Sequence, residues 1–213
     1  MLKTLAAAFA LLMVFACGST PGATVQGPTA ASVAMQTGDL PSGMKKCDVS
    51  GDIDSYLNSI KTKDPSAYAT TKAEWDAAKK SGATAGEVVF FADTTANCKA
   101  LASNSSGVSS ATYKLVVNFV LQFKDAATAA KGYTNQSIMG FSQASLTTAG
   151  TAAVVGTKTG LGPNSVTLTV PISSQSFYIA VWQNKAFMSI LAILNIDSAA
   201  SQKAALSENA RIH

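Results

Sequence analysis

The chain has 213 residues, 47% of them hydrophobic and 13% charged, which is enough apolar material for one hydrophobic core of ordinary size. The 16 basic residues outnumber the 12 acidic ones only slightly, and the single arginine, Arg211, leaves little capacity for bidentate contacts to phosphate. Because the lysines are scattered along the chain, the sequence argues against nucleic acid as a partner.

The first 16 residues are predicted to be an export signal. Lys3 precedes a run of twelve uncharged residues, 5–16, which is too short to span a bilayer comfortably, and Cys17 follows directly. The sequence from Val14 to Gly18 resembles a bacterial lipobox, the motif in which the signal peptidase cuts before a cysteine that then carries lipid. The resemblance implies that Cys17 begins the mature protein and anchors it to the extracytoplasmic side of the cell membrane. An ordinary signal peptide with a chance cysteine is the alternative.

The other two cysteines, Cys47 and Cys98, are predicted to form a disulfide, because an exported domain lies in an oxidising compartment. The bridge would close a loop of about 50 residues and stabilise the fold by roughly 4 kcal/mol. Two free buried thiols are the alternative. A metal site would need two further soft ligands, which this chain lacks.

Residues 17–43 are predicted to form a flexible spacer, and residues 44–213 a single globular domain. From Ser19 to Gly43 the chain is mainly Gly, Pro, Ser, Thr and Ala, with almost no charge and no apolar period. Such a segment has little apolar surface to offset the entropy cost of ordering it. We expect it to hold the domain away from the membrane.

The first part of the domain is predicted to be mainly helical, from the spacing of apolar residues and from helix-capping residues. The expected elements are a helix over 53–60 capped by Ser50 or Asp52, a helix from the N-cap Asp64 to Lys80 that stops at Gly82, a strand over 87–92, and a short helix capped by Asp93 and Thr94 that carries Cys98.

The most informative strand is predicted over 113–124. Its apolar residues alternate from Tyr113 to Phe123, while Lys114, Asn118 and Gln122 interrupt the other face. This pattern predicts one buried face and one half-exposed face.

The rest of the chain is predicted to form a helix, a long loop, an antiparallel meander and a last helix. This order implies an α+β fold in which helices pack on an antiparallel sheet with a C-terminal meander. The expected elements are a helix from the cap Asp125 to about Asn135, a surface loop over 138–151 of the kind that often binds ligands, strands over 152–157, 166–170, 177–183 and 186–194 with a hairpin at Asn184 and Lys185, and a helix from the cap Asp197 to Arg211.

Three stretches in roughly the last 100 residues resemble small exported lipoproteins of Gram-positive and related bacteria. They are Gly160-Leu161-Gly162, Val181 to Lys185, and Ala204 to Ile212. These lipoproteins are similar to extracellular sensor-domain and PsbP-like lipoproteins, so the resemblance implies an α/β/α sandwich around an antiparallel sheet. Many members have no assigned activity, and the resemblance therefore implies a fold and a cellular location more than a biochemical activity.

Three short patterns occur in the order found in penicillin-recognising serine enzymes. They are Ser42 to Lys45 as S-x-x-K, Tyr133 to Asn135 as Y-x-N, and Lys158 to Gly160 as K-T-G. Each is short enough to arise by chance, and Ser42 lies at the end of the predicted spacer, whereas the chemistry needs a serine fixed at the start of a buried helix. We therefore reject Ser42 as a nucleophile and Lys45 as its base.

The sequence offers few residues for other kinds of catalysis or for metal binding. The only histidine, His213, is the terminal residue, which argues against histidine-dependent catalysis and transition-metal binding. Asp48, Asp52 and Asp54 are dense enough for calcium but lack the glycine and glutamate of an EF-hand. Paired carboxylates of a glycosidase could come from Glu74, Asp76, Glu87 and Asp93, although each is more simply a surface or capping residue.

The favoured function is a membrane-anchored, non-enzymatic module that binds a small or lipidic ligand or an envelope protein, with no cofactor. It predicts an apolar cleft between helices and sheet, lined by Trp75, Phe119, Tyr178 or Trp182. The alternatives are a structural or accessory envelope component without a pocket, in which those aromatic residues are fully packed, and a hydrolase with Ser/Lys or carboxylate chemistry.

Overall fold

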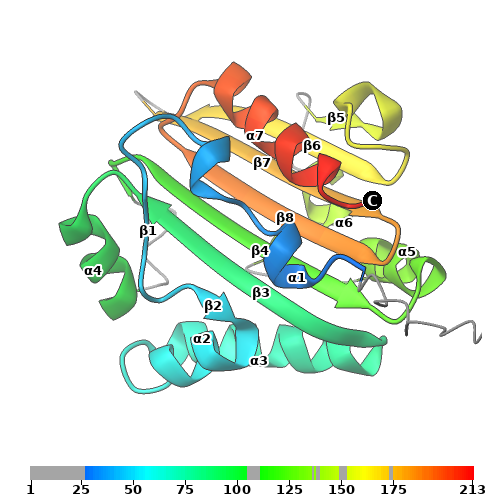
Figure 1. Ribbon diagram of the computed structural model, residues 1–213, viewed down its shortest axis with the longest axis horizontal. Helices are drawn as coiled ribbons and strands as arrows, with labels where there is room; N and C mark the ends of the chain where they lie inside the picture. Colours follow the sequence, from blue (N-terminus) through cyan, green and yellow to red (C-terminus); the bar gives the residue numbers. More distant parts are fainter. Residues whose placement is uncertain (1–26, 105–110, 136, 138–139, 149–152, 173–174) are drawn as a thin grey trace, which may run out of the picture.

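The computed structural model describes residues 27–104, 111–135, 137, 140–148, 153–172 and 175–213. Figure 1 shows one large twisted sheet with helices on both faces. The sheet has eight strands, all paired antiparallel, in the order β1-β3-β4-β8-β7-β6-β5, with β2 also paired to β3. The strands are β1 Lys45–Lys46, β2 Gly51–Asp52, β3 Ala83–Ala92, β4 Leu115–Phe123, β5 Val154–Val155, β6 Ser165–Ile172, β7 Gln175–Asn184 and β8 Phe187–Leu194.

The helices form two layers, one on each face of this sheet. One face packs against α2 Ile53–Ile60, α3 Pro65–Lys80, α4 Thr95–Ser103, α5 Ala126–Asn135 and α6 Gln143–Thr148. The other packs against α1 Ala30–Val33 and α7 Ser198–Ala210, with the 3₁₀ helix η1 Thr37–Asp39 beside α7. A second 3₁₀ helix, η3 Gly156–Thr159, links β5 to β6. The predicted α+β fold and its layered arrangement are confirmed.

Most helix starts lie where the capping residues predict them. In each case the side chain of the N-cap accepts a hydrogen bond from a backbone N–H in the first turn, which satisfies one of the donors that a helix start leaves unpaired. The pairs are Asp52 with Ser55 at 2.9 Å, Asp64 with Ala67 at 3.0 Å, Thr94 with Asn97 at 3.1 Å, Asp125 with Thr128 at 2.7 Å, and Asp197 with Ala200 at 2.9 Å.

Strand β4 is buried on both faces, and the predicted half-exposed face is wrong. Leu115, Val117 and Phe119 pack under the layer of α2 to α6, while Val116 and Val120 pack under α1 and α7. Asn118, which suggested a wet face, has no exposed surface. The sequence pattern misled because a polar residue in a strand marks either contact with water or a buried hydrogen-bond partner, and only packing decides which.

The partners of these polar residues come from the segment that was predicted to be a spacer. The backbone N–H of Met35 donates to Asn118 Oδ1 at 2.9 Å, and that of Ala30 donates to Gln122 Oε1 at 3.2 Å. We call residues 27–44 the N-terminal strap; Figure 1 shows it in blue, crossing the sheet to reach β1. Its buried apolar residues are Ala30, Val33, Ala34, Met35, Leu40 and Met44.

The predicted spacer is therefore wrong for residues 27–43. The strap has no helical or strand period because it is held by separate contacts to distant residues. The Arg211 side chain clamps it: Nε donates to the Val33 carbonyl at 3.1 Å and Nη2 to the Ala34 carbonyl at 3.0 Å, and the guanidinium pairs with both carboxylate oxygens of Asp39 at 2.9 Å. The predicted signal peptide and Cys17 lie outside the described residues.

Two further element boundaries differ from expectation. The predicted loop over 138–151 contains the helix α6, which buries Leu146 in the core. The predicted strand over 152–157 is limited, among the described residues, to Val154 and Val155 before η3 begins. The stretch 138–151 is rich in glycine, serine and threonine, whose weak preferences leave the local structure to packing.

Candidate functional site

A pocket of about 200 Å³ lies at one end of the sheet, between the edge strand β1 and helix α4. It is smaller than the pockets that enclose drug-sized ligands, which are typically about 300 Å³ or more. Its lining residues are Lys45, Lys46, Cys47, Asp48, Val49, Thr95, Cys98, Lys99 and Ala102. We call it the disulfide pocket.

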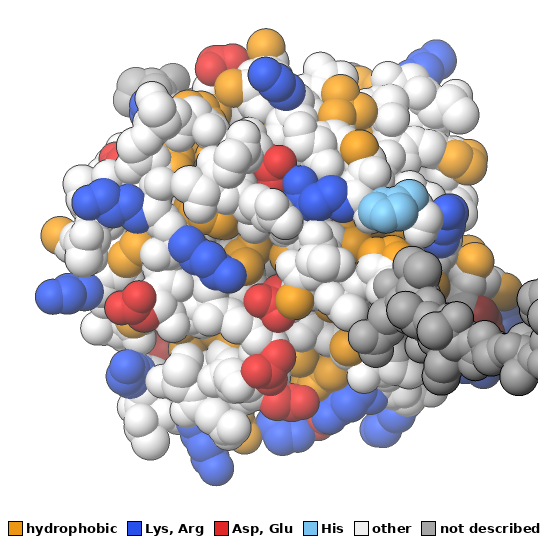
Figure 2. Space-filling model, in the orientation of Figure 1, with side chains coloured by type: hydrophobic (Ala, Val, Ile, Leu, Met, Phe, Trp, Pro, Cys, Tyr) orange, Lys and Arg blue, Asp and Glu red, His pale blue; other side chains and the backbone are white. Residues whose placement is uncertain are grey.

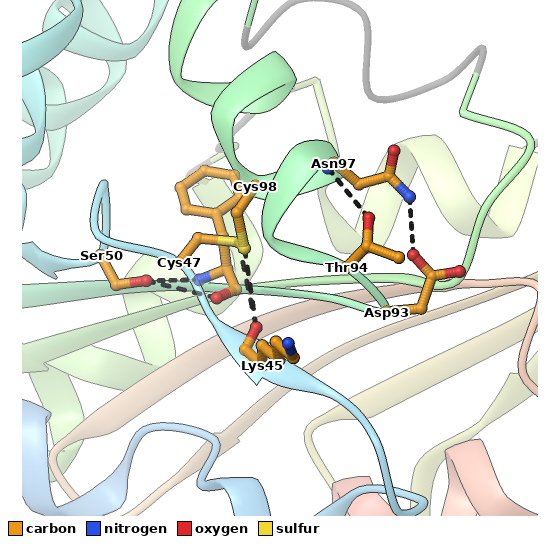
Figure 3. The surroundings of a disulfide bond; sticks show 8 residues. Lys45, Cys47, Ser50, Asp93, Thr94, Asn97 and Cys98 are labelled. Atoms are coloured by element: carbon orange, nitrogen blue, oxygen red, sulfur yellow. Dashed lines mark hydrogen bonds between the residues drawn. A yellow bond between two sulfur atoms is a disulfide. The ribbon is translucent and has the colours of Figure 1, made fainter.

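The predicted disulfide between Cys47 and Cys98 is confirmed, and it forms part of the pocket wall (Figure 3). The two Cα atoms are 5.1 Å apart, within the usual range for a bridge. Cys47 is held to the sheet because its N–H donates to the Phe90 carbonyl at 2.8 Å. The Lys45 carbonyl lies 3.8 Å from Cys98 Sγ, which is a packing contact because a disulfide sulfur carries no proton.

Helix α4 supplies the other wall. Its start is fixed by Thr94, and the Asn97 amide donates to Asp93 Oδ1 at 2.7 Å, which ties the first turn to the end of β3 (Figure 3). The pocket residues on this helix are Thr95, Cys98, Lys99 and Ala102. Their spacing of three, four and seven places them on one face of the helix.

The pocket is apolar inside and positively charged at its rim. The disulfide, Val49 and Ala102 supply apolar surface, whereas Lys45, Lys46 and Lys99 are exposed and outnumber the single acid, Asp48. Among the described residues of the lining, Thr95 is the one hydroxyl, and they include no histidine or second carboxylate to activate it. The arrangement suits binding of a small anion with an apolar part.

The four aromatic residues predicted to line a cleft do not lie together. Trp75 and Phe119 are in the core under α2 to α6, and Tyr178 and Trp182 are in the core on the opposite face of the sheet. All four are buried, with exposed fractions of 3%, 1%, 4% and 0%. They cannot line one shared cleft, because the sheet separates them.

The individual surroundings of these aromatic residues are those of core residues. Phe119 packs edge-on against Tyr56 and Phe90, with ring centroids 6.1 and 6.4 Å apart. The Trp75 indole donates to Asp54 Oδ1 at 3.1 Å and borders a small polar pocket of about 110 Å³ between α2 and α3. Burial raises the pKa of Tyr178 to about 12. A ligand-binding role for any of them stays a prediction.

The residues of the serine-enzyme pattern are far apart. Lys45 is on β1 at one edge of the sheet, and Lys158 is in η3 beside β5 at the other edge, with five strands between. At about 4.8 Å per strand this separation is roughly 29 Å. Tyr133 lies on α5 with its side chain buried in the core. The fold therefore does not assemble these three patterns into one site.

The candidate carboxylates have separate structural roles. Glu74 accepts from the Gly140 N–H at 3.2 Å, Asp76 pairs with Lys72 and Lys79, and Asp93 holds Asn97. Glu87 lies opposite Asp52 across β2 and β3, and partial burial raises its pKa. Within the described part of the chain, no group of three or more His, Cys, Asp or Glu side chains is placed to hold a metal ion.

The sequence predicted the two cysteines of the pocket, whereas Lys45 and Asp48 were considered there only for other roles and the remaining lining residues were not predicted. A usable signal was present, because Lys46 precedes Cys47 and Lys99 follows Cys98. A disulfide brings its neighbours together, so lysines beside both cysteines indicate a local positive charge. The apolar walls depend on how α4 packs and carry no such signal.

Comparisons with known proteins give no family. No protein-family model matches the chain, and no curated protein matches it. Among solved structures, the extracellular domain of PknH from Mycobacterium tuberculosis is similar, with a TM-score of 0.49 and 13% sequence identity over 87% of this chain and 98% of that chain. A likeness of this size carries no conclusion about function. No helix in the described ranges is both long and apolar enough to cross a bilayer.

Proposed function

We propose that this chain is a lipid-anchored extracytoplasmic domain that binds a small anionic ligand in the disulfide pocket without transforming it. The observation that carries the proposal is the pocket itself, in which a disulfide and apolar side chains are rimmed by Lys45, Lys46 and Lys99. Lysine ammonium groups are point charges that suit carboxylate or phosphate without demanding planar geometry.

Two features support the proposed extracytoplasmic location. Structural disulfides persist in oxidising compartments and are rare in the cytosol. The sequence before the described residues reads as an export signal that ends at Cys17. Lipid on that cysteine would attach the domain to the membrane that it has crossed.

The position of the strap also bears on how the pocket would be oriented relative to the membrane. The strap begins near Gln122, beside the first residues of β3, whereas the pocket lies beside Ala92 at the other end of the same strand. The ten residues of β3 span about 33 Å. The nine residues between Cys17 and Gly27 can reach at most about 35 Å. The strap therefore enters the domain at the end of β3 opposite the pocket, which favours an orientation with the pocket away from the membrane.

The test is to map ligand binding by NMR with small phosphates and carboxylates. We expect amide shifts confined to 45–49 and 95–102, and about a thirtyfold weaker affinity in Lys46→Ala/Lys99→Ala, because each of the two lost ammonium groups removes roughly 1 kcal/mol of attraction near the surface. Lys63→Ala/Lys203→Ala is the matched control with the same loss of charge elsewhere, and it should bind as wild type does. Binding at another site, or equally weakened binding in both variants, would contradict ligand binding in the disulfide pocket.

A structural or accessory envelope component is the second candidate. The complete burial of the four aromatic residues favours it, since that is what a solid core without a ligand cleft requires. Exposed apolar side chains on β5 and α7, Val154, Val155 and Leu206, offer a small surface for a partner. If none of the small anions binds, the structural or accessory role is favoured over the ligand-binding role.

A further inference from the structure

Four lysines from three parts of the fold gather at the end of the sheet where the strap begins. Lys79 and Lys80 end α3, Lys124 follows β4, and Lys185 lies in the turn between β7 and β8. All four side chains are exposed. Figure 2 shows several Lys and Arg side chains along the lower edge of the molecule, where α3 lies. We call Lys79, Lys80, Lys124 and Lys185 the tether-end lysines.

Backbone hydrogen bonds hold these lysines side by side. The Gly82 N–H donates to the Lys79 carbonyl at 3.0 Å, and the Lys124 N–H donates to the Gly82 carbonyl at 3.2 Å. Next to it, the Phe123 N–H donates to the carbonyl of Ala186, the residue after Lys185, at 2.7 Å. The cluster is therefore a fixed feature of this end of the sheet.

Acidic groups offset only part of this charge. Asp76 lies 3.1 Å from the Lys79 ammonium and also pairs with Lys72. Asp125 follows Lys124 and accepts hydrogen bonds from Thr128. In the described ranges, the ion pairs within 4 Å do not include Lys80, Lys124 or Lys185. The end carries a net positive charge that faces solvent.

The strap begins at this same end. Ala30 is bonded to Gln122, which lies two residues before Lys124 and opposite Phe187. A tether that starts here is attached closer to these lysines than to those at the disulfide pocket, which favours their approach to the surface that holds the lipid. Each lysine near an anionic bilayer contributes roughly 1 kcal/mol of attraction within about a Debye length.

We infer that the tether-end lysines dock this end of the domain on the anionic headgroups of the membrane that anchors it. This inference rests on the proposed anchoring at Cys17 for its orientation. Docking fixes the domain upright, with the disulfide pocket pointing away from the bilayer.

The experiment measures binding to vesicles by the chain without residues 1–16 and with Cys17→Ser, so that no lipid contributes. Vesicles of phosphatidylcholine with and without phosphatidylglycerol are compared at low salt. We expect binding only to the anionic vesicles, and a loss of about tenfold or more in Lys80→Glu/Lys124→Glu/Lys185→Glu. The matched control is Lys45→Glu/Lys46→Glu/Lys99→Glu, which makes the same charge change at the pocket end and should lose much less. Circular dichroism confirms that each variant is folded.

Equal losses in the two triple variants, or no preference of the unsubstituted protein for anionic vesicles, would overturn the docking surface. The result is separate from the anchor, because the protein in this assay carries no lipid. If native protein lacks lipid but the unlipidated protein still prefers anionic vesicles, the proposed anchoring at Cys17 is wrong. The membrane-docking role of the tether-end lysines is then still supported.

Discussion

Glu208 is the residue whose chemistry depends most on where the fold places it. It lies on α7 with no exposed surface, and its Oε1 accepts hydrogen bonds from the Asn118 amide at 3.1 Å and from the Ser189 hydroxyl. Its Oε2 has no partner among the described residues. Burial raises the pKa of Glu208 to about 8, against smaller opposing effects of these two hydrogen bonds and of Arg211, while Asp39 adds to the rise.

A raised pKa makes the fold less stable as pH rises. Between about pH 4.5 and 8 the carboxyl is protonated in the folded chain and ionised in the unfolded one, so the free energy of unfolding should fall through this window by several kcal/mol, at about 1.4 kcal/mol per pH unit. Urea unfolding at a series of pH values checks this. Glu208→Gln should remove most of the slope, and an unchanged slope in that variant would contradict the assignment.

At the scale of elements, the strap and α7 stabilise each other through the only arginine of the chain. Arg211→Met removes the donors to Val33 and Ala34 and leaves Asp39, whose side chain is 10% exposed, without its cation, so that the carboxylate keeps only the Gln36 N–H. We expect the variant to lose about 2–3 kcal/mol of stability and to exchange amide hydrogens faster in residues 30–40. Hydrogen exchange with mass spectrometry measures this opening.

Lys203→Met is the control for that experiment, because Lys203 is an exposed cation on the same helix. It should leave exchange in the strap unchanged. Slow exchange of the strap in Arg211→Met would show that the buried apolar side chains hold it without the clamp.

At the scale of the whole molecule, intact mass spectrometry of protein extracted from its native membrane tests three features at once. These are cleavage of the signal peptide, lipid on Cys17 and the disulfide. We expect a chain that begins at Cys17, carries added acyl mass, and gains two hydrogens on reduction as Cys47 and Cys98 separate. An unmodified mass that includes Met1 would contradict the anchor, whereas loss of residues 1–16 without acyl mass would indicate an ordinary signal peptide.

Local rules in the sequence were sufficient for much of the fold. The caps Asp64, Asp125 and Asp197 follow from interactions between near neighbours, and the disulfide follows from the small number of cysteines. All are found in the structure. For the candidate site, Cys47 and Cys98 could be predicted. The pocket around them could not, because its walls come from packing between distant segments.

The tertiary structure alone decided the strap, the second buried face of β4 and the chemistry of Glu208. Residues 27–43 have a composition typical of a flexible chain, yet Val33 and Met35 are buried because a sheet face built more than 80 residues later offers Asn118 as a hydrogen-bond partner. Whether a polar or small residue lies in water or in the core depends on what covers it, and that cover comes from remote parts of the chain.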